Sequence, residues 1–416
     1  MKNTLLSFCI ILLSFFSFAQ AVQETVPPFH IKTISFVQGG QNAIPLFRLG
    51  DRFELQFDDL HGDEEDYFYQ ITHCDYDWKP SQLSKNEYLI GFDDQRIINY
   101  TNSFNALQIY SHYKLAFPNQ FTQLKVSGNY LITILNDDRE VVFSRKFILF
   151  EDLVSVPMQV KRARDVRQVE KKHNLDFAIK SASITFQSPL QNVKVLLMQN
   201  GKINQGITNI KPMYTIGNDL IYKYDTETQF WGGNEYLFFE NKNIMAANNS
   251  IGRVDSKGGL YNSYLYTNNA RANQPYTFWP DINGNFLVNN VNAENPEIES
   301  DYAWVYFSLS APTFYADKDI YIVGMFNNYE LTDENKLEYN SKKGIFEKAL
   351  MIKQGFTNYR YIIADKNKKI DEENAIDGNF YQTENNYFAI VYYRENNQRY
   401  DRVIGKGTAS SLDIIN

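Results

Sequence analysis

Cysteine and histidine are scarce in this sequence, and their scarcity limits the chemistry that it can support. The chain has two cysteines and five histidines in 416 residues. Cys9 lies in an apolar N-terminal stretch, so Cys74 is the one cysteine left for the rest of the chain and no intramolecular disulfide is expected. A zinc site needs three or four ligands, and no CxxC, HxH or HExxH spacing is present. We therefore expect no disulfide, no metal centre and no cofactor.

An excess of basic residues is also missing, as are the short motifs of common enzymes. The formal net charge of −8 argues against nucleic acid or anionic lipid as the main partner. The sequence has no GxSxG, P-loop or GxGxxG motif, and no pair of carboxylates stands out for glycoside hydrolysis. We expect no catalytic residues, and a periplasmic hydrolase is a disfavoured alternative.

Long apolar runs are confined to the N-terminus. Lys2 precedes an almost continuously apolar stretch from Leu5 to Phe18, which is too short to span a bilayer comfortably. Ser17 and Ala19 place small residues at the two positions that a signal peptidase inspects. The sequence thus predicts a cleaved signal peptide over residues 1–19 and a mature chain outside the cytoplasm.

Aromatic residues, in contrast, are abundant, at 15% of the chain. They recur in short runs between polar turn residues, a pattern typical of strands on a half-buried sheet. Residues 129–135 and 140–143, joined by a polar turn, predict a β-hairpin. No long amphipathic helix is evident. The sequence predicts an all-β protein built from antiparallel sandwiches.

A chain of this length predicts two or three domains. Pro157 and the basic stretch 161–167 indicate one junction, and the acidic residues around Pro296 indicate another. We expect β-rich domains over residues 20–155, 156–300 and 301–404, followed by a flexible tail over 405–416. Residues 246–273 are rich in Asn, Ser, Gly and Tyr and predict a long exposed loop.

The densest group of reactive side chains is the run His73-Cys74-Asp75-Tyr76-Asp77-Trp78. A cysteine nucleophile needs a base beside it, but alternation along a strand sends His73 and Cys74 to opposite faces. We interpret the run as a strand end whose side chains form a packed, hydrogen-bonded corner. A metal or catalytic role and a binding surface are the alternatives.

An acidic run covers residues 58–66 and contains His61. Its carboxylates could hold a hard cation such as calcium, but their spacing lacks the regularity of a dedicated calcium loop. We interpret the run as a solvated turn between two strands.

The section after residue 301 contains Gly324-Met325-Phe326-Asn327 at the end of a strand-like run and Tyr359-Arg360-Tyr361 in a later one. This order resembles early-set immunoglobulin-like modules related to glycogen-binding domains. Those modules stack glucan rings on exposed tryptophans, whereas Tyr329 stands where a tryptophan is common and Trp304 is the last tryptophan of the chain. The resemblance therefore supports the fold more than the ligand.

Further motifs accompany the run at His73. They are Asn99-Tyr100, Ser103-Phe104-Asn105, Tyr110-Ser111-His112-Tyr113 and Phe117-Pro118-Asn119. Taken with the early-set-like end, they resemble the plug protein family of the type IX secretion system of Bacteroidetes over nearly the full length. The resemblance identifies a family signature of structural character: His73, Cys74, Asp75, Tyr76, Asp77, Trp78, His112 and Tyr113.

The resemblance implies tandem immunoglobulin-like β-sandwich domains, of which the C-terminal one is early-set-like. It also implies a non-enzymatic periplasmic protein, peripheral to the outer membrane and not inserted in it. Its partner would be the large barrel of the type IX translocon, whose periplasmic opening it would bind and occlude. We expect residues 261–273 to be a contact element. The alternative is a secreted carbohydrate-binding β-sandwich protein.

Overall fold

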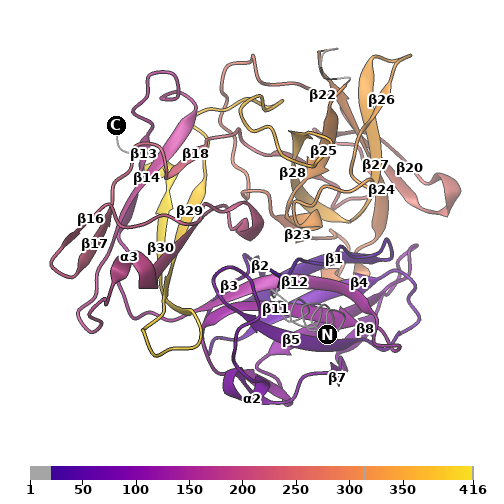
Figure 1. Ribbon diagram of the computed structural model, residues 1–416. Helices are drawn as coiled ribbons and strands as arrows, with labels where there is room; N and C mark the ends of the chain where they lie inside the picture. Colours follow the sequence, from indigo (N-terminus) through magenta and orange to yellow (C-terminus); the bar gives the residue numbers. More distant parts are fainter. Residues whose placement is uncertain (1–19, 313–314, 316, 415–416) are drawn as a thin grey trace, which may run out of the picture.

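The computed structural model describes residues 20–312, 315 and 317–414. The signal peptide expected over residues 1–19, with Cys9, lies outside the described residues. The described chain is mostly β-structure with a few short helices, and its mainly antiparallel sheets surround three large hydrophobic cores (Figure 1). We call the parts around these cores the first unit (residues 31–151), the second unit (153–231 and 386–414) and the third unit (237–376).

The first unit has two sheets that contribute to one aromatic and aliphatic core. Alternation along the strand brings Phe53, Leu55 and Phe57 into this core. One sheet has the order β2 (Gln41–Ala43), β1 (Ile31–Gln38), β4 (Phe53–Asp59), β9 (Ser111–Phe117) and β8 (Tyr100–Asn102). The other has the order β3 (Leu46–Arg48), β12 (Val141–Phe150), β11 (Gly128–Leu135), β5 (Phe68–Cys74) and β7 (Gln95–Arg96). Helix α2 (Lys85–Tyr88) and the pair β6 (Leu89–Gly91) and β10 (Thr122–Leu124) complete the unit.

The β-hairpin predicted over residues 129–143 is confirmed. β11 and β12 pair in antiparallel register, from Gly128 opposite Leu149 to Leu135 opposite Val141. β11 also pairs with β5, which sets Tyr130 opposite His73 and Asn129 opposite Cys74. The run at His73 therefore begins at the end of a central strand.

The second unit combines strands from distant parts of the chain. One sheet contains β13 (Met158–Arg162), β14 (Lys172–Ile179), β17 (Asp219–Tyr222), β16 (Tyr214–Ile216) and β18 (Gln229–Trp231). The other contains β15 (Val193–Gln199), β29 (Asn386–Tyr393) and β30 (Arg402–Ser410), with α3 (Pro189–Asn192) leading into β15. Side chains of both sheets meet in the second core.

The third unit also combines two groups of strands from distant parts of the chain around one core. Its first group of strands is β19 (Leu237–Glu240), β28 (Gly355–Ala364), β23 (Phe286–Val288) and β25 (Asp319–Val323). Its second group is β20 (Ile251–Asp255), β21 (Tyr261–Leu265), β22 (Asn268–Asn269), β24 (Tyr302–Ser310), β27 (Ile345–Lys353) and β26 (Glu338–Asn340). Helix α4 (Pro296–Glu299) precedes β24, and both groups contribute to the third core.

The linear division expected from the sequence does not hold beyond the first unit. β29 and β30, expected in a C-terminal domain, belong with β15, and β19 and β23, expected in a middle domain, pair with β28. Figure 1 shows the yellow C-terminal strands beside the magenta strands of the second unit. Local hydrophobic patterns carry no information on partners this distant in sequence. They therefore could not show that strands on both sides of residue 300 belong to the same sheets.

The flexible tail expected over residues 405–416 is also wrong for residues 405–414, which are the part of it that the structure describes. β30 continues to Ser410, and a 3-10 turn follows over Ser411–Asp413. A Cβ atom at Gly405 would lie 2.4 Å from Cγ2 of Val154, and one at Gly407 would lie 2.6 Å from the carbonyl oxygen of Val156. The small residues of this segment permit close packing and do not indicate fraying.

The long exposed loop expected over residues 246–273 is also wrong. β20 and β21 pair antiparallel, and β21 and β22 run parallel to β24. The Asn, Ser and Tyr residues there form an outer part of a sheet, where polar side chains are tolerated. Among the described residues, no helix has the length and apolar character needed to cross a membrane.

Candidate functional site

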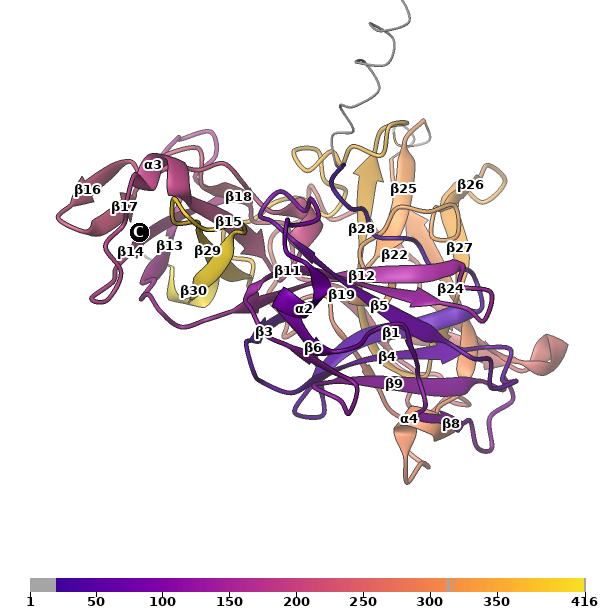
Figure 2. The ribbon, with the colours of Figure 1, turned by 60° about the horizontal axis from the view of Figure 1, so that its bottom comes forward.

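The first unit contacts both other units through buried side chains, and Figures 1 and 2 show it lying against each of them. The apolar cluster toward the second unit includes Leu46, Tyr76, Ile148, Phe150, Leu196, Met198, Ile390, Tyr392 and Val403. The cluster toward the third unit includes Leu60, Tyr110, Tyr302 and Met351. Both clusters contain residues of the predicted family signature or of its flanking motifs.

His73 and Cys74 open the signature run at the end of β5. The His73 ring packs against Tyr88, Tyr130 and Tyr400, and its Nδ1 lies 2.7 Å from Ser81 Oγ. Burial lowers the pKa of His73 to about 4 and raises the pKa of the Cys74 thiol to about 12. Near neutral pH this pair therefore provides neither a thiolate nor an imidazolium ion.

Asp75 and Tyr76 connect the corner to the second unit. Asp75 Oδ1 lies 2.7 Å from Arg394 Nη2, and the Tyr76 amide donates to Asp401 Oδ2 (3.0 Å). The Tyr76 hydroxyl donates to the Val195 carbonyl (2.8 Å) and accepts from the Asn209 amide (2.9 Å). We call this arrangement the corner joint; its members are Asp75, Tyr76, Asn129, Lys194, Val195, Asn209, Tyr392, Arg394 and Asp401.

The last two residues of the run lie closer to solvent. Asp77 pairs with Lys79 at 2.7 Å, and both side chains are about half exposed. Lys146 Nζ lies 4.7 Å from the centre of the Trp78 ring, a cation–π contact. The Trp78 carbonyl accepts a hydrogen bond from the Val22 amide, and this bond holds the start of the described chain against the corner.

His112 and Tyr113 lie in β9, away from the corner joint. The Tyr113 hydroxyl donates to the Glu65 carbonyl at 2.7 Å, and its ring stacks on Phe57. His112 Nδ1 lies 2.6 Å from Asp58 Oδ1 in the interior. The signature therefore marks two separate places: the corner joint and a second buried network.

This second network, the Asp58 joint, connects the first unit to the third; its members are Asp58, His112, Tyr302 and Lys353. Asp58 Oδ2 accepts from the Tyr302 hydroxyl at 2.5 Å and from Lys353 Nζ at 2.7 Å. Lys353 also donates to the Glu297 carbonyl at 2.6 Å and stands 4.1 Å from the centre of the Tyr110 ring. One buried carboxylate thus organises side chains from β4, β9, β24 and β27.

Electrostatics keep this carboxylate charged. Burial favours the neutral acid, but Lys353 and His112 outweigh it and hold the pKa of Asp58 below its usual value. Burial also lowers the pKa of Lys353, although Asp58 opposes that change, and it raises the pKa of Tyr302 well above its usual value. The Asp58 joint is an ion pair with hydrogen-bonded support, which is the arrangement that a buried charge requires.

The charged residues of these joints could not be identified from the sequence. Asp58 is one of several acidic residues in the run 58–66, and Lys353 follows an apolar segment at the end of β27. Arg394 and Asp401 lie in a polar stretch between β29 and β30. Nothing in these local patterns distinguishes a buried charge from a solvated one.

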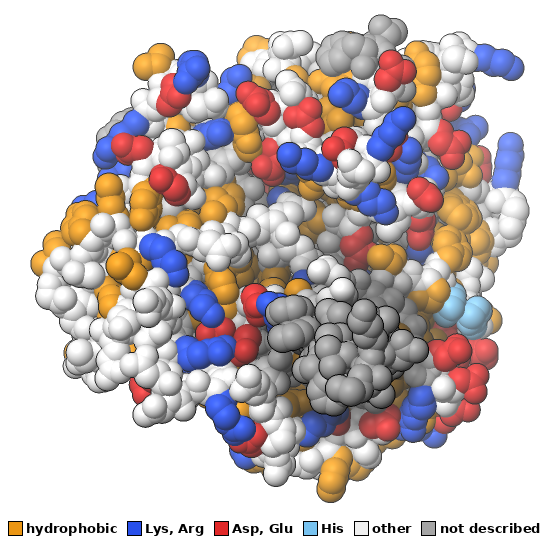
Figure 3. Space-filling view, viewed as in Figure 1, with side chains coloured by type: hydrophobic (Ala, Val, Ile, Leu, Met, Phe, Trp, Pro, Cys, Tyr) orange, Lys and Arg blue, Asp and Glu red, His pale blue; other side chains and the backbone are white. Residues whose placement is uncertain are grey.

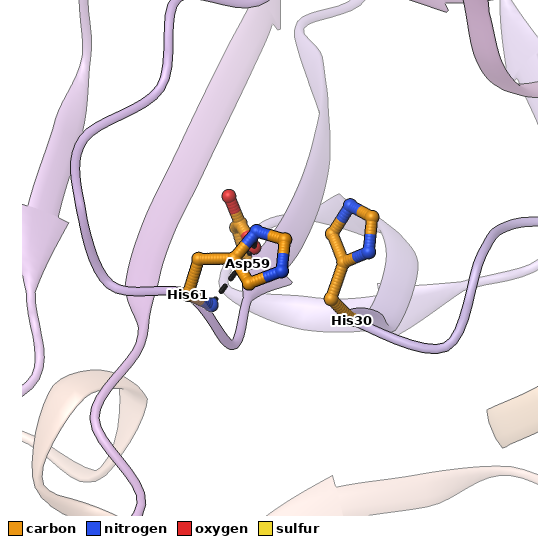
Figure 4. A group of neighbouring side chains, drawn as sticks. All are labelled: His30, Asp59 and His61. Atoms are coloured by element: carbon orange, nitrogen blue, oxygen red, sulfur yellow. Dashed lines mark hydrogen bonds and ion pairs between the residues drawn. The ribbon is translucent and has the colours of Figure 1, made fainter.

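Three side chains form a candidate cation-binding group at the start of the first unit: Asp59 and His61 of this unit and His30, which directly precedes it (Figure 4). The two imidazole rings stack with their centres 4.2 Å apart, and His61 Nδ1 lies 3.4 Å from Asp59 Oδ1. The sequence alone does not predict this group, because His30 and His61 are distant in the chain. The register of β1 and β4, which sets Ile31 opposite Asp59, brings them together.

Taken together, the fold and its joints define a protein of packed β-sheet units whose signature residues are occupied in contacts between and within those units. Comparison with known proteins agrees with this class. Residues 31–151 match the family described as "Type 9 secretion system plug protein 1st domain". The chain thus carries the first domain of the type 9 secretion system plug protein family, as the motifs in its sequence predicted.

One solved structure extends the likeness to nearly the whole chain. It is the crystal structure of a hypothetical protein from Parabacteroides merdae, which has 30% sequence identity and a TM-score of 0.88. The match covers 94% of this chain and 100% of the other. A search of curated proteins found no match.

Proposed function

We propose that this protein is a non-enzymatic plug that binds the outer-membrane barrel of the type IX translocon and closes its periplasmic opening. The observation that carries the proposal is the family match over the first unit. The protein would act in the periplasm, at the surface of the outer membrane. The predicted signal peptide supports this location.

The joints support the mechanical side of the proposal. A plug has to resist deformation under contact with a large partner, and separate sandwiches on flexible linkers would not. The corner joint and the Asp58 joint fix the first unit to both others with buried hydrogen bonds and ion pairs. The hydrogen bonds of the two joints can form only in one arrangement of the three units, as expected for a rigid plug.

The finer fold assignment is part of the same proposal. We infer that the units are immunoglobulin-like sandwiches and that the third is early-set-like. The motif Gly324-Met325-Phe326-Asn327 directly follows β25, and Tyr359 and Tyr361 lie in β28, which pairs with β25. This is the order expected from the resemblance.

A copurification experiment tests the function. The protein is expressed from its own locus with a C-terminal affinity tag, outer membranes are solubilised in mild detergent, and copurifying proteins are identified by mass spectrometry. We expect the translocon barrel in near-stoichiometric amount. Recovery of the protein only as a free periplasmic monomer would contradict the proposal. In a deletion strain, an open barrel should also admit large antibiotics, and the intact gene should restore the barrier.

The contact element expected at residues 261–273 is better tested by a point substitution than by a deletion. Removing residues 250–270 would take away β20 and β21 and damage the sheet around β24. Point substitution of Tyr266, which is 57% exposed, tests the idea without that damage. If Tyr266→Ser leaves copurification with the barrel unchanged, this segment is not the contact element.

One observation favours the alternative, a carbohydrate-binding protein. Tyr264 and Tyr306 stack with ring centres 4.4 Å apart in a cleft of about 880 Å³, where Tyr339, Asn340 and Glu347 also lie. Arg253 also lies 3.8 Å from the centre of the Tyr264 ring, so Tyr306, which is 37% exposed, is the ring of this pair that a sugar would meet. The residues first considered are less suited, because Lys202 lies 5.0 Å from the centre of the Tyr329 ring and Phe29 stacks on Trp304. Glucan affinity that disappears in Tyr306→Ala would support this alternative, and its absence in the native protein would remove it.

A further inference from the structure

The group around His30 lies on a part of the surface where strand pairing places imidazoles beside carboxylates. His30 immediately precedes β1, and its carbonyl accepts from the amide of Leu60, so His61 follows directly on the opposite segment. One ligand atom from each of His30, Asp59 and His61 lies within 4.8 Å of the others. A second, overlapping group adds Asp63 and Glu65. Figure 3 shows histidine side chains beside a group of acidic side chains on this face.

Burial and hydrogen bonds fix the orientation of the Asp59 carboxylate. Its side chain is fully buried, and the Tyr67 hydroxyl donates to its Oδ2 at 2.9 Å. Its Oδ1 accepts from the His61 amide at 3.0 Å. A hydrogen bond to the far oxygen of a ligating carboxylate orients it and is a common support in metal sites.

The charge balance also favours a cation. Among the described residues, Asp59 forms no ion pair with lysine or arginine, and the nearest basic group is the imidazole of His61, whose Nδ1 lies 3.4 Å from Oδ1. Asp66 and Glu64 of the same run differ, since Asp66 pairs with Arg96 and Glu64 accepts from Tyr100 and Asn102. A buried carboxylate without a basic partner is costly unless a cation compensates it.

The donor set indicates the kind of cation. Two imidazoles with one carboxylate suit zinc and related transition metals, whereas calcium and magnesium prefer oxygen ligands alone. His61 is free to turn, because its side chain is 52% exposed.

We propose that His30, Asp59 and His61 form a solvent-facing site for one divalent transition metal ion of the zinc type. The stacked rings turn so that one nitrogen of each meets the ion at about 2.0–2.1 Å, with Asp59 as the third ligand and water completing the shell. Asp63 and Glu65 add negative charge beside the ion. The site would link the start of β1 to the segment after β4, next to the Asp58 joint. It is independent of the proposed plug function.

Calorimetry on the mature chain without an affinity tag tests the site. The protein is treated with EDTA, dialysed and titrated with zinc chloride, and then separately with calcium chloride. We expect one zinc ion per chain and much weaker binding of calcium. His61→Ala and His30→Gln should each weaken zinc binding by about tenfold or more.

Asp66→Asn is the matched control. It removes one carboxylate from the same acidic run, at a residue already paired with Arg96, and should leave zinc affinity unchanged. Thermal melting of the metal-free His61→Ala protein, which alters an exposed side chain, verifies that it still folds. Zinc affinity in the native protein weaker than about 100 µM would overturn the proposal. So would equal affinity in His61→Ala, or calcium binding more tightly than zinc.

Discussion

Asp58 in β4 and Lys353 in β27 form an ion pair across the boundary between the first and third units. Asp58 Oδ2 and Lys353 Nζ are 2.7 Å apart, and the two side chains are 0% and 3% exposed. His112 Nδ1 lies beside Oδ1 of the same carboxylate, and the Tyr302 hydroxyl donates to its Oδ2. This buried carboxylate and its partners therefore contribute to fixing the relative placement of the two units, together with the hydrogen bonds from the Leu107 and Gln108 amides to Asp301.

Removing one member of this pair should be strongly destabilising. Lys353→Met leaves the Asp58 carboxylate buried without its main counter-charge, and such a change costs about 3–5 kcal/mol. The measurement is urea-induced unfolding followed by tryptophan fluorescence. Lys343→Met is the control, because Lys343 pairs with Glu347 at the surface and an exposed pair contributes less than about 1 kcal/mol. Equal unfolding midpoints for the two variants would contradict the role given to the Asp58 joint.

The stability of the protein should fall with acid through His73. Burial lowers the pKa of His73 from 6.5 in the unfolded chain to about 4 in the folded one. The unfolded state thus binds the proton more readily, so stability is intact above about pH 6.5 and falls as the pH drops toward 4. The loss amounts to roughly 3 kcal/mol at 1.4 kcal/mol per pKa unit.

The substitution His73→Asn separates the loss of stability due to His73 from the loss due to other titrating groups. His73→Asn does not titrate, so its unfolding free energy should fall less steeply than that of the native protein over the same pH range. His173, whose pKa burial also lowers, acts in both proteins and cancels in the comparison. Parallel pH profiles for the two proteins would refute this account.

Local sequence patterns predicted part of this architecture. The β11–β12 hairpin follows from alternation and a polar turn, because both are properties of neighbouring residues. The pairing of β15 with β29 does not, since the whole third unit lies between these strands in the sequence and their pairing is determined by tertiary packing. The small residues at Gly405 and Gly407 illustrate the same limit: they predict flexibility locally but provide close contact with Val154 and Val156.

The candidate sites likewise depend partly on local sequence patterns and partly on contacts between distant residues. Strand alternation and sparse histidine were enough to favour a packed corner at His73 over a reactive cluster, although its role stays a prediction. The proximity of His30 to His61 depends on the β1–β4 register, and the burial of Asp58 depends on the third unit. Neither fact is encoded within a window of a few residues.

Cys74 should be inert in the folded protein. Its side chain is buried, and burial raises the pKa of its thiol to about 12. At pH 8 only about one thiol in ten thousand is ionised, and that one has little access to solvent. Dithionitrobenzoate should therefore label the mature native chain slowly and label one thiol per chain rapidly in guanidinium chloride. Rapid labelling without denaturant would show that the corner opens in solution.

The Tyr76 hydroxyl should contribute measurably to the corner joint. Tyr76→Phe keeps the ring against Tyr392 but leaves the Val195 carbonyl and the Asn209 amide without this partner. Unsatisfied buried groups cost about 1–3 kcal/mol, which we expect as the loss in unfolding free energy. The exposed Tyr214→Phe substitution is the control and should be neutral.

Amide hydrogen exchange adds a local readout of the same substitution. The amide of Asn209 loses its acceptor in Tyr76→Phe and should exchange faster, while amides in β11 and β12 of the first unit keep their protection. Faster exchange throughout the first unit would instead indicate that the substitution unfolds the corner as a whole. Unchanged exchange at Asn209 would show that the hydroxyl does not hold the second unit at this point.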